Sequence, residues 1–543
     1  MKIYLVYLAL NTDQFQSYNY GLGYISAVLK QSGYQPVYTL IKYNDDVTEF
    51  LSQLKEEKPD IIAFSITSAQ YEHFKIIINE IKKIEENSRS FIVCGGVHPT
   101  LDPESVIEIN GVDCLIRGEG EYAFLELVKA IDNKKNYVDI KNCWFRTEDN
   151  VIKNEIRPLI ENLDDLPFPD KESLNFQQEI IKDNSIIRFI FSRGCPFNCT
   201  YCCNSALSSI YPNSKKYFRQ RSPVKAIEEI EDAVKNYKFN SIIFDDDIIT
   251  LNKAWFFEFF ELYKEKFRYP FRCNIRVGTV DDAMMKLLKD AGASNVAFGI
   301  EQGNEDFRKR ILKRNMTNKQ IIDTINLCKK YNIRNDNSFV MVGLPFENKK
   351  LFFETVRLYR KASTVGTASI FQPYPGTLLG DICKKNNWMP DKQFYNERIE
   401  ATISYPDFSK EQIQLCSNAF RYLVLKKSIP ISTPLEIVPA VYDFLESKKV
   451  IFDYYKARFP DFPKKQIQLC YHTFRFLRLK KTNPTNIPSE LAAVVGNFIQ
   501  SKKVISDYYK NRLGFIFSRT GIAALKNRLL KLLRKNKNKK IQL

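Results

Sequence analysis

The sequence predicts an α/β protein built from two successive parallel-sheet domains and a helical C-terminal region. Short apolar, β-branched runs alternate with segments of helical periodicity through about the first 390 of the 543 residues. A proline-rich acidic stretch at 157–170 interrupts this alternation and indicates a linker. A 54-residue repeat occupies the region that follows. We therefore expect a doubly wound sheet, then an open (β/α)6 barrel, then a helical region with a duplicated unit.

The composition favours a globular, cytoplasmic protein. Hydrophobic residues make up 44% of the chain, and no run of 18 or more apolar residues predicts a membrane-spanning helix. The N-terminus is interpreted as a first strand rather than a signal peptide, so we expect the 12 cysteines to remain free thiols in a reducing cytosol. The formal net charge of +18 admits an anionic substrate, a nucleic acid or a membrane surface as a partner.

The first domain is expected over residues 1–145 as a doubly wound parallel sheet. Ligands bind such sheets outside the carboxyl ends of the strands. Ser65 and Thr67 follow one expected strand, and Gly95, Gly96 and His98 follow the next. No G-x-G-x-x-G is present, which argues against a dinucleotide. The expected strands are 2–8, 60–65, 91–94 and 112–116, and the expected helices include 20–32 and 71–84.

Residues 146–185 are expected to form the linker and residues 186–390 the barrel. Six βα units predict a partial (β/α)6 barrel, whose functional residues belong at the carboxyl ends of the strands. The strands are expected at 186–192, 241–245, 271–277, 295–300, 337–343 and 367–372, and the helices at 223–237, 252–266, 281–291, 318–331 and 349–362.

Three cysteines, Cys195, Cys199 and Cys202, follow the first barrel strand with the spacing C-x3-C-x2-C. Three thiolates so close together can hold three irons of a cubane cluster and leave the fourth iron open. The alternatives are plain buried thiols and a structural zinc site, which needs a fourth Cys or His at a matching spacing. Cys203 adjoins Cys202 and cannot easily turn to the same metal, and the next cysteine is Cys273. The spacing therefore favours an iron–sulfur cluster.

A strand followed by such a loop resembles the radical S-adenosylmethionine (SAM) superfamily. The resemblance implies a [4Fe-4S] cluster whose open iron chelates the amino and carboxylate groups of SAM, which one electron cleaves to a 5′-deoxyadenosyl radical. It also implies SAM contacts at the ends of later strands. Asp246 would bind the ammonium, Arg276 the carboxylate or the substrate, and Glu301 the ribose, while Gly343 would flank adenine. The acidic run around Asp246 has a surface cluster as its alternative interpretation, and the family usually has a glycine where Phe346 stands.

Four motifs of the first domain, in order, resemble the cobalamin-binding domain that precedes the radical SAM domain in part of this family. They are Tyr20-Gly-Leu-Gly-Tyr, Ser65-x-Thr67, Gly95-Gly96-x-His98-Pro-Thr and Arg117-Gly-Glu-Gly-Glu121. The resemblance implies a Rossmann-like domain in which Ser65 and Thr67 reach the nucleotide tail of cobalamin. The double glycine would let the corrin approach the backbone, because a Cβ would clash.

The Asp-x-His-x-x-Gly motif that supplies a lower cobalt ligand in many cobalamin proteins is missing. The chain has three histidines, His73, His98 and His472. The resemblance therefore implies base-off cobalamin with no histidine on cobalt, and His98 is interpreted as a polar loop residue rather than a metal ligand. The alternative is a domain that has lost cobalamin and only supports the barrel.

The C-terminal third is expected to be helical over 391–517. The segment beginning at Lys410 recurs at Lys464, and both copies place apolar residues at helical spacing. We interpret this as a duplication that extends a helical cap, with Cys416 and Cys470 in its core rather than as ligands.

Residues 518–543 form a basic tail. From Arg519 onward it holds nine basic residues, no acidic ones and an apolar stripe at helical spacing. This pattern suits peripheral docking on an anionic membrane, and a solvated tail is the alternative.

The resemblance implies cobalamin-dependent radical SAM catalysis, most often methyl transfer to an unactivated carbon. We expect a small-molecule or lipid substrate and an external one-electron donor such as flavodoxin or ferredoxin. One alternative is radical rearrangement or oxidative cyclisation without methyl transfer. Another is an RNA-binding or RNA-modifying protein that uses the basic tail, although no RNA-recognition signature supports nucleic acid as a partner.

Overall fold

We describe the protein from a computed structural model, in which the described residues are 1–10, 18–84, 90–173, 176–213, 216–336, 338–391, 394–429, 431–432 and 435–438. The chain divides into two compact units, Met1–Pro439 and Ala440–Leu543. The later copy of the repeat, with Cys470 and His472, and the basic tail lie outside the described residues, so the membrane role of the tail stays a prediction. Among the described helices, none has the length and apolar character that a membrane crossing requires.

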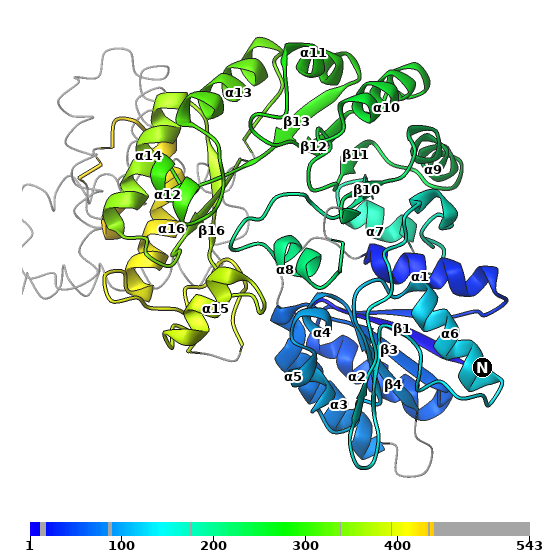
Figure 1. Ribbon diagram of the computed structural model, residues 1–543. Coiled ribbons are helices and arrows are strands. Elements are labelled where there is room, and N and C mark those ends of the chain that lie inside the picture. Colours follow the sequence, from blue (N-terminus) through cyan, green and yellow to red (C-terminus); the bar gives the residue numbers. More distant parts are fainter. Residues whose placement is uncertain are drawn as a thin grey trace, which may run out of the picture. The chain divides into compact units, whose positions relative to one another are not determined.

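The N-terminal domain, blue to cyan in Figure 1, contains a seven-stranded sheet. Its strand order is β2-β1-β3-β4-β5-β6-β7. Its first five strands pair in parallel, and the last two add an antiparallel hairpin at one edge. The strands are β1 (Ile3–Leu8), β2 (Val37–Ile41), β3 (Ile61–Ser65), β4 (Phe91–Gly95), β5 (Cys114–Ile116), β6 (Cys143–Arg146) and β7 (Val151–Lys153). The helices are α1 (Tyr20–Gln31), α2 (Asn44–Glu57), α3 (Tyr71–Ile84), α4 (Val97–Leu101), α5 (Pro103–Ile107) and α6 (Glu121–Asp132), with a 3-10 turn η1 (Ser68–Gln70).

Helices cover both faces of this sheet, which confirms the doubly wound class. Alternate residues of β1 enter two separate cores. Tyr4 and Val6 pack with residues of α2, α3 and α5, whereas Ile3 and Leu5 pack with residues of α1 and α6. A strand buried on both faces needs a continuous apolar run, and this explains why β1 was predictable.

The sheet extends further than the sequence suggested. The expected boundary at residue 145 falls inside β6, and β7 lies within the segment expected to be linker. The expected strands also omitted β2, an edge strand with only two of its five residues buried. Short edge strands carry weak patterns because they bury one face or less.

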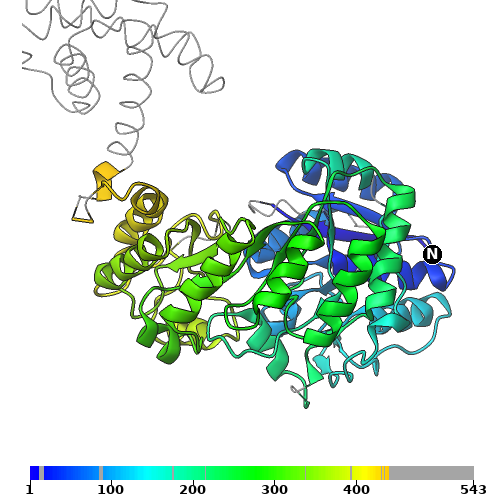
Figure 2. The same cartoon turned by 90° about the horizontal axis from the view of Figure 1, so that it is seen from above.

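The second domain contains six successive parallel strand positions in two hydrogen-bonded sheets, with orders β13-β12-β11-β8 and β14-β15-β16. Phe298 separates β13 from β14, so the single strand expected at 295–300 is two short ones. Green helices form a row along these strands in Figure 2. The strands are β8 (Ile186–Phe189), β11 (Ser241–Phe244), β12 (Phe271–Asn274), β13 (Ala293–Ala297), β14 (Gly299–Glu301), β15 (Ser338–Val342) and β16 (Gly366–Ile370).

Helices alternate with these strands, as the periodicity predicted. A two-residue antiparallel pair, β9 (Ser192–Arg193) with β10 (Arg219–Gln220), stands apart from the two sheets. The helices are α7 (Phe176–Lys182), α8 (Cys203–Ser209), α9 (Pro223–Asn236), α10 (Lys253–Lys266), α11 (Asp282–Asp290), α12 (Glu305–Arg310), α13 (Asn318–Lys330), α14 (Lys349–Ala362) and α15 (Leu378–Lys385).

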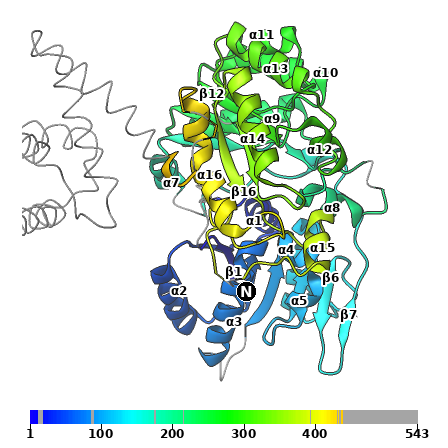
Figure 3. The same cartoon turned by 90° about the vertical axis from the view of Figure 1, so that its left-hand side faces the viewer.

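The first copy of the repeat forms α16 (Lys410–Leu425), which packs on α14 and β16 (Figure 3). Ser409 and Gln412 form a capping box at its start. Arg360 of α14 donates to the carbonyl oxygens of Leu423 and Ile429, both at 2.7 Å, and so satisfies groups that a helix end leaves open. Cys416 is fully buried, which confirms its interpretation as a core residue.

Glu347 closes the turn that follows β15. Its carboxylate accepts hydrogen bonds from the backbone N–H of Gly343 at 2.7 Å and of Leu344 at 3.2 Å, and from the Gln302 side chain at 3.2 Å. Burial raises the pKa of Glu347 to about 7.

The buried Glu347 carboxyl group should make the free energy of unfolding depend on pH. Because its folded-state pKa lies above the ordinary 4.5, the folded protein keeps a proton that the unfolded chain has lost. The resulting stabilisation is complete below pH 4.5 and is lost as the pH rises through about 7. At about 1.4 kcal/mol per pKa unit, the stability of the wild type relative to E347Q should fall by about 3 kcal/mol over this interval. Urea unfolding at several pH values measures the difference, and a difference that does not vary with pH would contradict the prediction.

Candidate functional site

The cysteine loop connects β9 to α8. At its start, Gly194 has φ +80, and a Cβ there would lie 2.4 Å from the Tyr217 carbonyl oxygen, so the turn needs glycine. On its far side, the Thr200 hydroxyl donates to the carbonyl oxygen of Ile311 at 2.7 Å, and the Thr200 N–H donates to that of Leu312 at 3.3 Å. The loop is therefore packed against the segment that leads into β10, and hydrogen bonds hold it to the segment after α12.

The three predicted cluster ligands lie on this loop and influence one another electrostatically. Cys199 is buried, and Cys195 and Cys202 are partly exposed. Within the described ranges, no three His, Cys, Asp or Glu side chains are arranged to hold a metal ion. The donor set nevertheless fits an iron–sulfur cluster, because thiolates are its usual ligands. Burial raises the pKa of Cys195 to about 11, and bound metal would keep this sulfur as the thiolate.

Two arginines bring positive charge to the loop. Nη1 of Arg314 lies 3.7 Å from Sγ of Cys199 and donates to the Tyr201 hydroxyl at 3.1 Å. The guanidinium of Arg276 lies 3.6 Å from the centroid of the Phe197 ring. Arg276 was predicted from the sequence, whereas Arg314 was not. These cations would balance the negative charge of a thiolate-bound cluster.

Glu301 joins the same group of side chains. It is buried, and its Oε1 lies 3.9 Å from Nη1 of Arg314. Its backbone has φ +66, which is uncommon for a residue with a Cβ. Burial raises the pKa of Glu301, and the nearby Arg314 opposes this shift. The structure therefore brings Arg276 and Glu301 to the cysteine loop, as the resemblance implied.

In the acidic run after β11, Asp247 rather than the expected Asp246 lies beside the cysteine loop. Asp246 is fully buried and accepts hydrogen bonds from the Phe191 N–H and the Ser192 hydroxyl, so its carboxylate fixes the chain before the loop instead of facing an open site. Asp247 is exposed, accepts a hydrogen bond from Asn204 at 2.8 Å and contributes its charge to the field at Cys195. Asp247 is thus the acid of this run that lies beside the cysteines.

Gly343 follows β15 and packs against the C-terminal segment. A Cβ at Gly343 would lie 2.7 Å from Ile413 of α16, and its carbonyl oxygen accepts the Tyr405 hydroxyl at 2.8 Å. Its N–H is bonded to Glu347. The C-terminal segment therefore covers one side of Gly343, and the contact of its backbone with adenine stays a prediction.

The residues predicted for cobalamin share the carboxyl edge of the first sheet. Ser65 at the end of β3 pairs in register with Gly95 at the end of β4, and Thr67 follows two residues later. The Ser65 hydroxyl accepts a hydrogen bond from the Asn19 side chain at 3.3 Å. Asn19, which also caps α1, was not predicted.

The two glycines of this edge differ in their roles. Gly96 has φ +106, and a Cβ there would lie 2.6 Å from the Ile66 carbonyl oxygen, so the fold itself requires glycine. At Gly95 the nearest atom to an added Cβ is 3.7 Å away, which is ordinary contact. The open approach to Gly95 suits a flat ligand such as a corrin.

His98 is buried beside this edge, and both of its ring nitrogens have partners within the protein. Its Nδ1 lies 3.1 Å from the Ser68 hydroxyl, its Nε2 lies 3.4 Å from the Ser105 hydroxyl, and its ring packs on Tyr71. Burial lowers the pKa of His98 to about 4. Both nitrogens are engaged within the protein, in agreement with its interpretation as a polar loop residue rather than a metal ligand.

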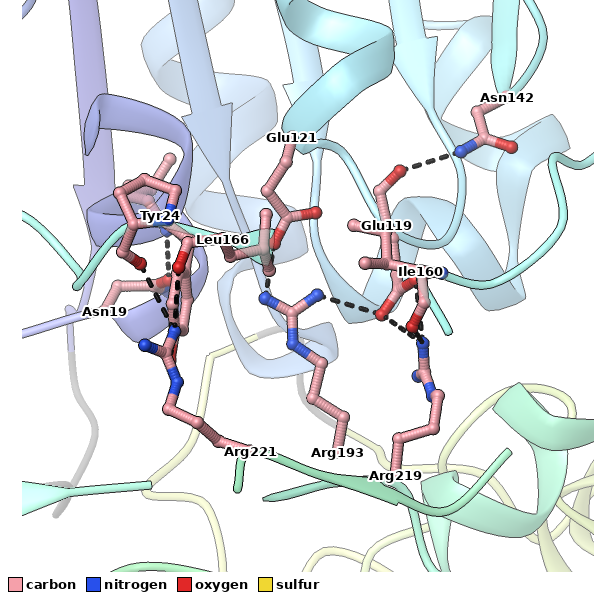
Figure 4. Close-up of polar contacts among 12 residues, drawn as sticks. Asn19, Tyr24, Glu119, Glu121, Asn142, Ile160, Leu166, Arg193, Arg219 and Arg221 are labelled. Carbon is pink, nitrogen blue, oxygen red and sulfur yellow. Dashed lines mark hydrogen bonds and ion pairs between the residues drawn. The ribbon is translucent and has the colours of Figure 1, made fainter. Parts of the chain in front are cut away.

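Charged side chains join the two domains next to the cysteine loop (Figure 4). Glu119 accepts hydrogen bonds from Arg193 at 2.9 Å and from Arg219 at 3.1 Å, and Glu121 accepts one from Arg193 at 2.5 Å. The N–H of Ile160 in the linker also donates to Glu119 at 2.8 Å. Burial opposes the charged form of Glu119, but Arg193 and Arg219 hold its pKa below the ordinary value.

This contact was not predicted from the sequence. The Arg117-Gly-Glu-Gly-Glu121 motif was noted only for its resemblance to the cobalamin-binding domain, and the structure shows that its two glutamates pair with arginines of the other domain. A second contact places α4, which follows Gly96, against α8, which follows the cysteines. The two candidate cofactor edges are therefore neighbours.

A surface depression of about 600 Å³ between α2 and α3 lies elsewhere. Its lining includes Lys55, Lys58, Glu80 and Lys83, near the C-terminal ends of these helices. Those ends lie at the amino edge of the parallel sheet, opposite the edge where ligands bind.

Comparison with known families decides the assignment. Residues 189–359 match the radical SAM superfamily, and residues 8–128 match the B12 binding domain. The chain belongs to the radical SAM enzymes that carry a B12-binding domain. These domains imply a [4Fe-4S] cluster, SAM and cobalamin as cofactors. The enzyme class expected from the sequence is confirmed.

Relatives of this radical SAM enzyme differ in their named reactions. An uncharacterized methyltransferase of Pyrococcus horikoshii is 28% identical over 422 residues, which cover 77% of this chain and 90% of that protein. The anaerobic magnesium-protoporphyrin IX monomethyl ester cyclase of Rubrivivax gelatinosus is 30% identical over 376 residues, which cover 65% of this chain and 64% of the cyclase.

Solved structures share the fold. The radical SAM methyltransferase TsrM of Kitasatospora setae, solved with tryptophan and a SAM analog, has a TM-score of 0.56 at 16% identity and covers 72% of this chain and 77% of its own. The cobalamin-dependent radical SAM enzyme OxsB has a TM-score of 0.61 at 17% identity and covers 98% of this chain and 83% of its own.

The interdomain ion pairs predict a specific cost of removing one carboxylate. E119Q removes the carboxylate that lies between Arg193 and Arg219 and leaves the two guanidinium groups close together. The free energy of unfolding should therefore fall by about 1–3 kcal/mol. The matched control is E126Q, because Glu126 pairs with Arg157 of the linker at a more exposed position. An exposed pair contributes less than about 1 kcal/mol. Urea unfolding of both variants provides the comparison, and equal losses would show that the buried cluster has no special role.

Proposed function

We propose that this enzyme transfers a methyl group to an unactivated carbon of a small molecule or lipid. The observation that supports this most is the neighbouring position of the Gly95 edge and the cysteine loop, joined through α4, α8 and the Glu119 pairs. When bound, the cluster and SAM supply the radical and cobalamin supplies the methyl group. The protein orients these groups and keeps water out.

The residues around the loop suit defined roles toward the cluster and SAM. Cys195, Cys199 and Cys202 hold the cluster. Asp247, exposed beside the loop, takes the place of Asp246 as the partner of the SAM ammonium, which needs a countercharge. Glu301 accepts hydrogen bonds from ribose hydroxyls.

The first domain would hold cobalamin without a histidine on cobalt. Ser65 and Thr67 lie at the edge where the nucleotide tail would enter, and Gly95 leaves the backbone open to the corrin. His98 has both ring nitrogens occupied, and the His73 ring packs on Phe394 at 4.8 Å between centroids. This supports the base-off form. The electron would come from an external donor such as flavodoxin or ferredoxin.

Oxidative cyclisation is the second candidate, because a relative with 30% identity is a cyclase. Incubation of the reduced enzyme with methyl-labelled SAM and extracts from cells that lack the gene separates the two reactions. Label in a new product supports methyl transfer. A new product without label would favour cyclisation and contradict the proposal.

The cluster assignment predicts unequal effects of neighbouring cysteines. Replacement of Cys195, Cys199 or Cys202 by alanine should abolish iron binding and SAM cleavage, because each removes one of three ligands. C203A should retain both, since Cys203 begins α8. Iron analysis and detection of 5′-deoxyadenosine after anaerobic reconstitution measure these outcomes. Loss of the cluster in C203A alone would show that the ligands are wrongly assigned.

The cobalamin edge predicts a variant that folds but excludes the cofactor. An added Cβ at Gly95 meets only ordinary contacts, so we expect G95V to fold and to lose corrinoid uptake at least tenfold by steric clash. G96A should instead lower the stability, because its Cβ meets backbone. Absorption spectra after corrinoid loading and urea unfolding give the two readouts. Normal corrinoid uptake by G95V would contradict the assignment of this edge.

A further inference from the structure

The segment after α15 reaches both domains. The N–H of Ile370, at the end of β16, donates to the carbonyl oxygen of Arg398 at 2.7 Å. Four residues before Arg398, the Phe394 ring packs on His73 of α3 in the B12-binding domain. Residues 394–398 therefore connect the last barrel strand to the first domain.

Three side chains of this region interact through a hydrogen bond and an ion pair. The Tyr374 hydroxyl donates to Oε1 of Glu397, and Nε of Arg398 lies 3.9 Å from the same oxygen. The Glu397 side chain is 7% exposed, whereas that of Arg398 is 54% exposed. The guanidinium is thus held on one side by a buried acid and has N–H groups available for a second anion.

The electrostatic neighbours of the group locate it between the two cofactor edges. Burial, and after it the charge of Glu397, raises the pKa of Tyr7, which lies in β1 of the B12-binding domain. The electrostatic neighbours of Arg398 include Tyr374, Glu397 and Cys203, which directly follows the cluster ligands. A substrate that reacts with both cofactors has to lie in this region.

Two further features indicate a site adapted to a ligand. Arg398 has φ +67, and backbone strain of this kind is concentrated at functional sites. Gln372, two residues before Tyr374, is 4% exposed, and neither polar atom of its amide has a hydrogen-bond partner. Buried amides are normally paired, so this side chain points to a missing polar partner.

We propose that Arg398, held by Tyr374 and Glu397, binds an anionic group of the substrate, a carboxylate or a phosphate. This inference rests on the proposed function and narrows it to acidic substrates. The second guanidinium contact would be a charge-assisted hydrogen bond, which is stronger and more directional than a neutral one. Gln372 would supply a further contact at the same strand end.

The test uses the full chain loaded with cob(II)alamin and two small anions, methylphosphonate and trifluoroacetate. The unpaired electron on cobalt speeds the relaxation of ³¹P or ¹⁹F nuclei that bind nearby. We expect faster relaxation of at least one probe with the wild type and at least a fivefold smaller effect with R398L. R398K should lie between them, because lysine offers a point charge without a planar fork.

The matched control is R310L, because Arg310 is also an exposed arginine paired with an acid, Asp306, but lies on α12. It should behave as the wild type. Equal relaxation with the wild type, R398L and R310L would overturn the assignment of Arg398. Isothermal titration with the same anions needs no cobalamin, and there too R398L should lose binding. Absorption spectra that show no cobalamin uptake would contradict the proposed function instead, so the two failures are distinguishable.

Discussion

The carboxylate of Glu119 holds two guanidinium groups that would otherwise repel each other. Arg193 of β9 and Arg219 of β10 lie directly opposite each other in the short antiparallel pair. Like charges in such positions are unfavourable. The acids that resolve this repulsion, Glu119 and Glu121, come from the B12-binding domain. Because Arg193 stands two residues before Cys195, the position of the cysteine loop depends on a domain that supplies none of its ligands. Charge as well as packing therefore sets the position of the cysteine loop relative to the first domain.

The sequence predicted best those features that depend on local pattern. Strands buried on both faces gave continuous apolar runs, as in β1, and the cysteine spacing alone indicated the cluster loop. Contacts between distant residues had no such signal. Arg314 and Cys199 are 115 positions apart, and Arg193 and Glu119 are 74 apart. The choice between Asp246 and Asp247 likewise depended on which carboxylate the strand turned inward, and neighbouring acids in a run look alike until the backbone is placed.

Several residues at or after the ends of the barrel strands adopt a backbone conformation that favours glycine. Glu301 has φ +66, Phe346 has φ +68 and Arg398 has φ +67. Each costs on the order of 1 kcal/mol or more for a residue with a Cβ. The resemblance to the radical SAM family implies a glycine where Phe346 stands, and the φ of Phe346 is one that favours glycine. The ring packs on Trp388 at 6.0 Å between centroids, which offsets part of the cost.

The residues that α16 buries are only partly repeated in the second copy of the duplicated segment. The apolar residues Ile413, Cys416, Phe420 and Leu423 recur 54 positions later as Ile467, Cys470, Phe474 and Leu477. The buried Val424, however, corresponds to Arg478. A guanidinium cannot replace a buried valine without a partner for its charge. The later copy therefore carries at this position a residue that the first copy cannot accept, so the two copies are not interchangeable in sequence.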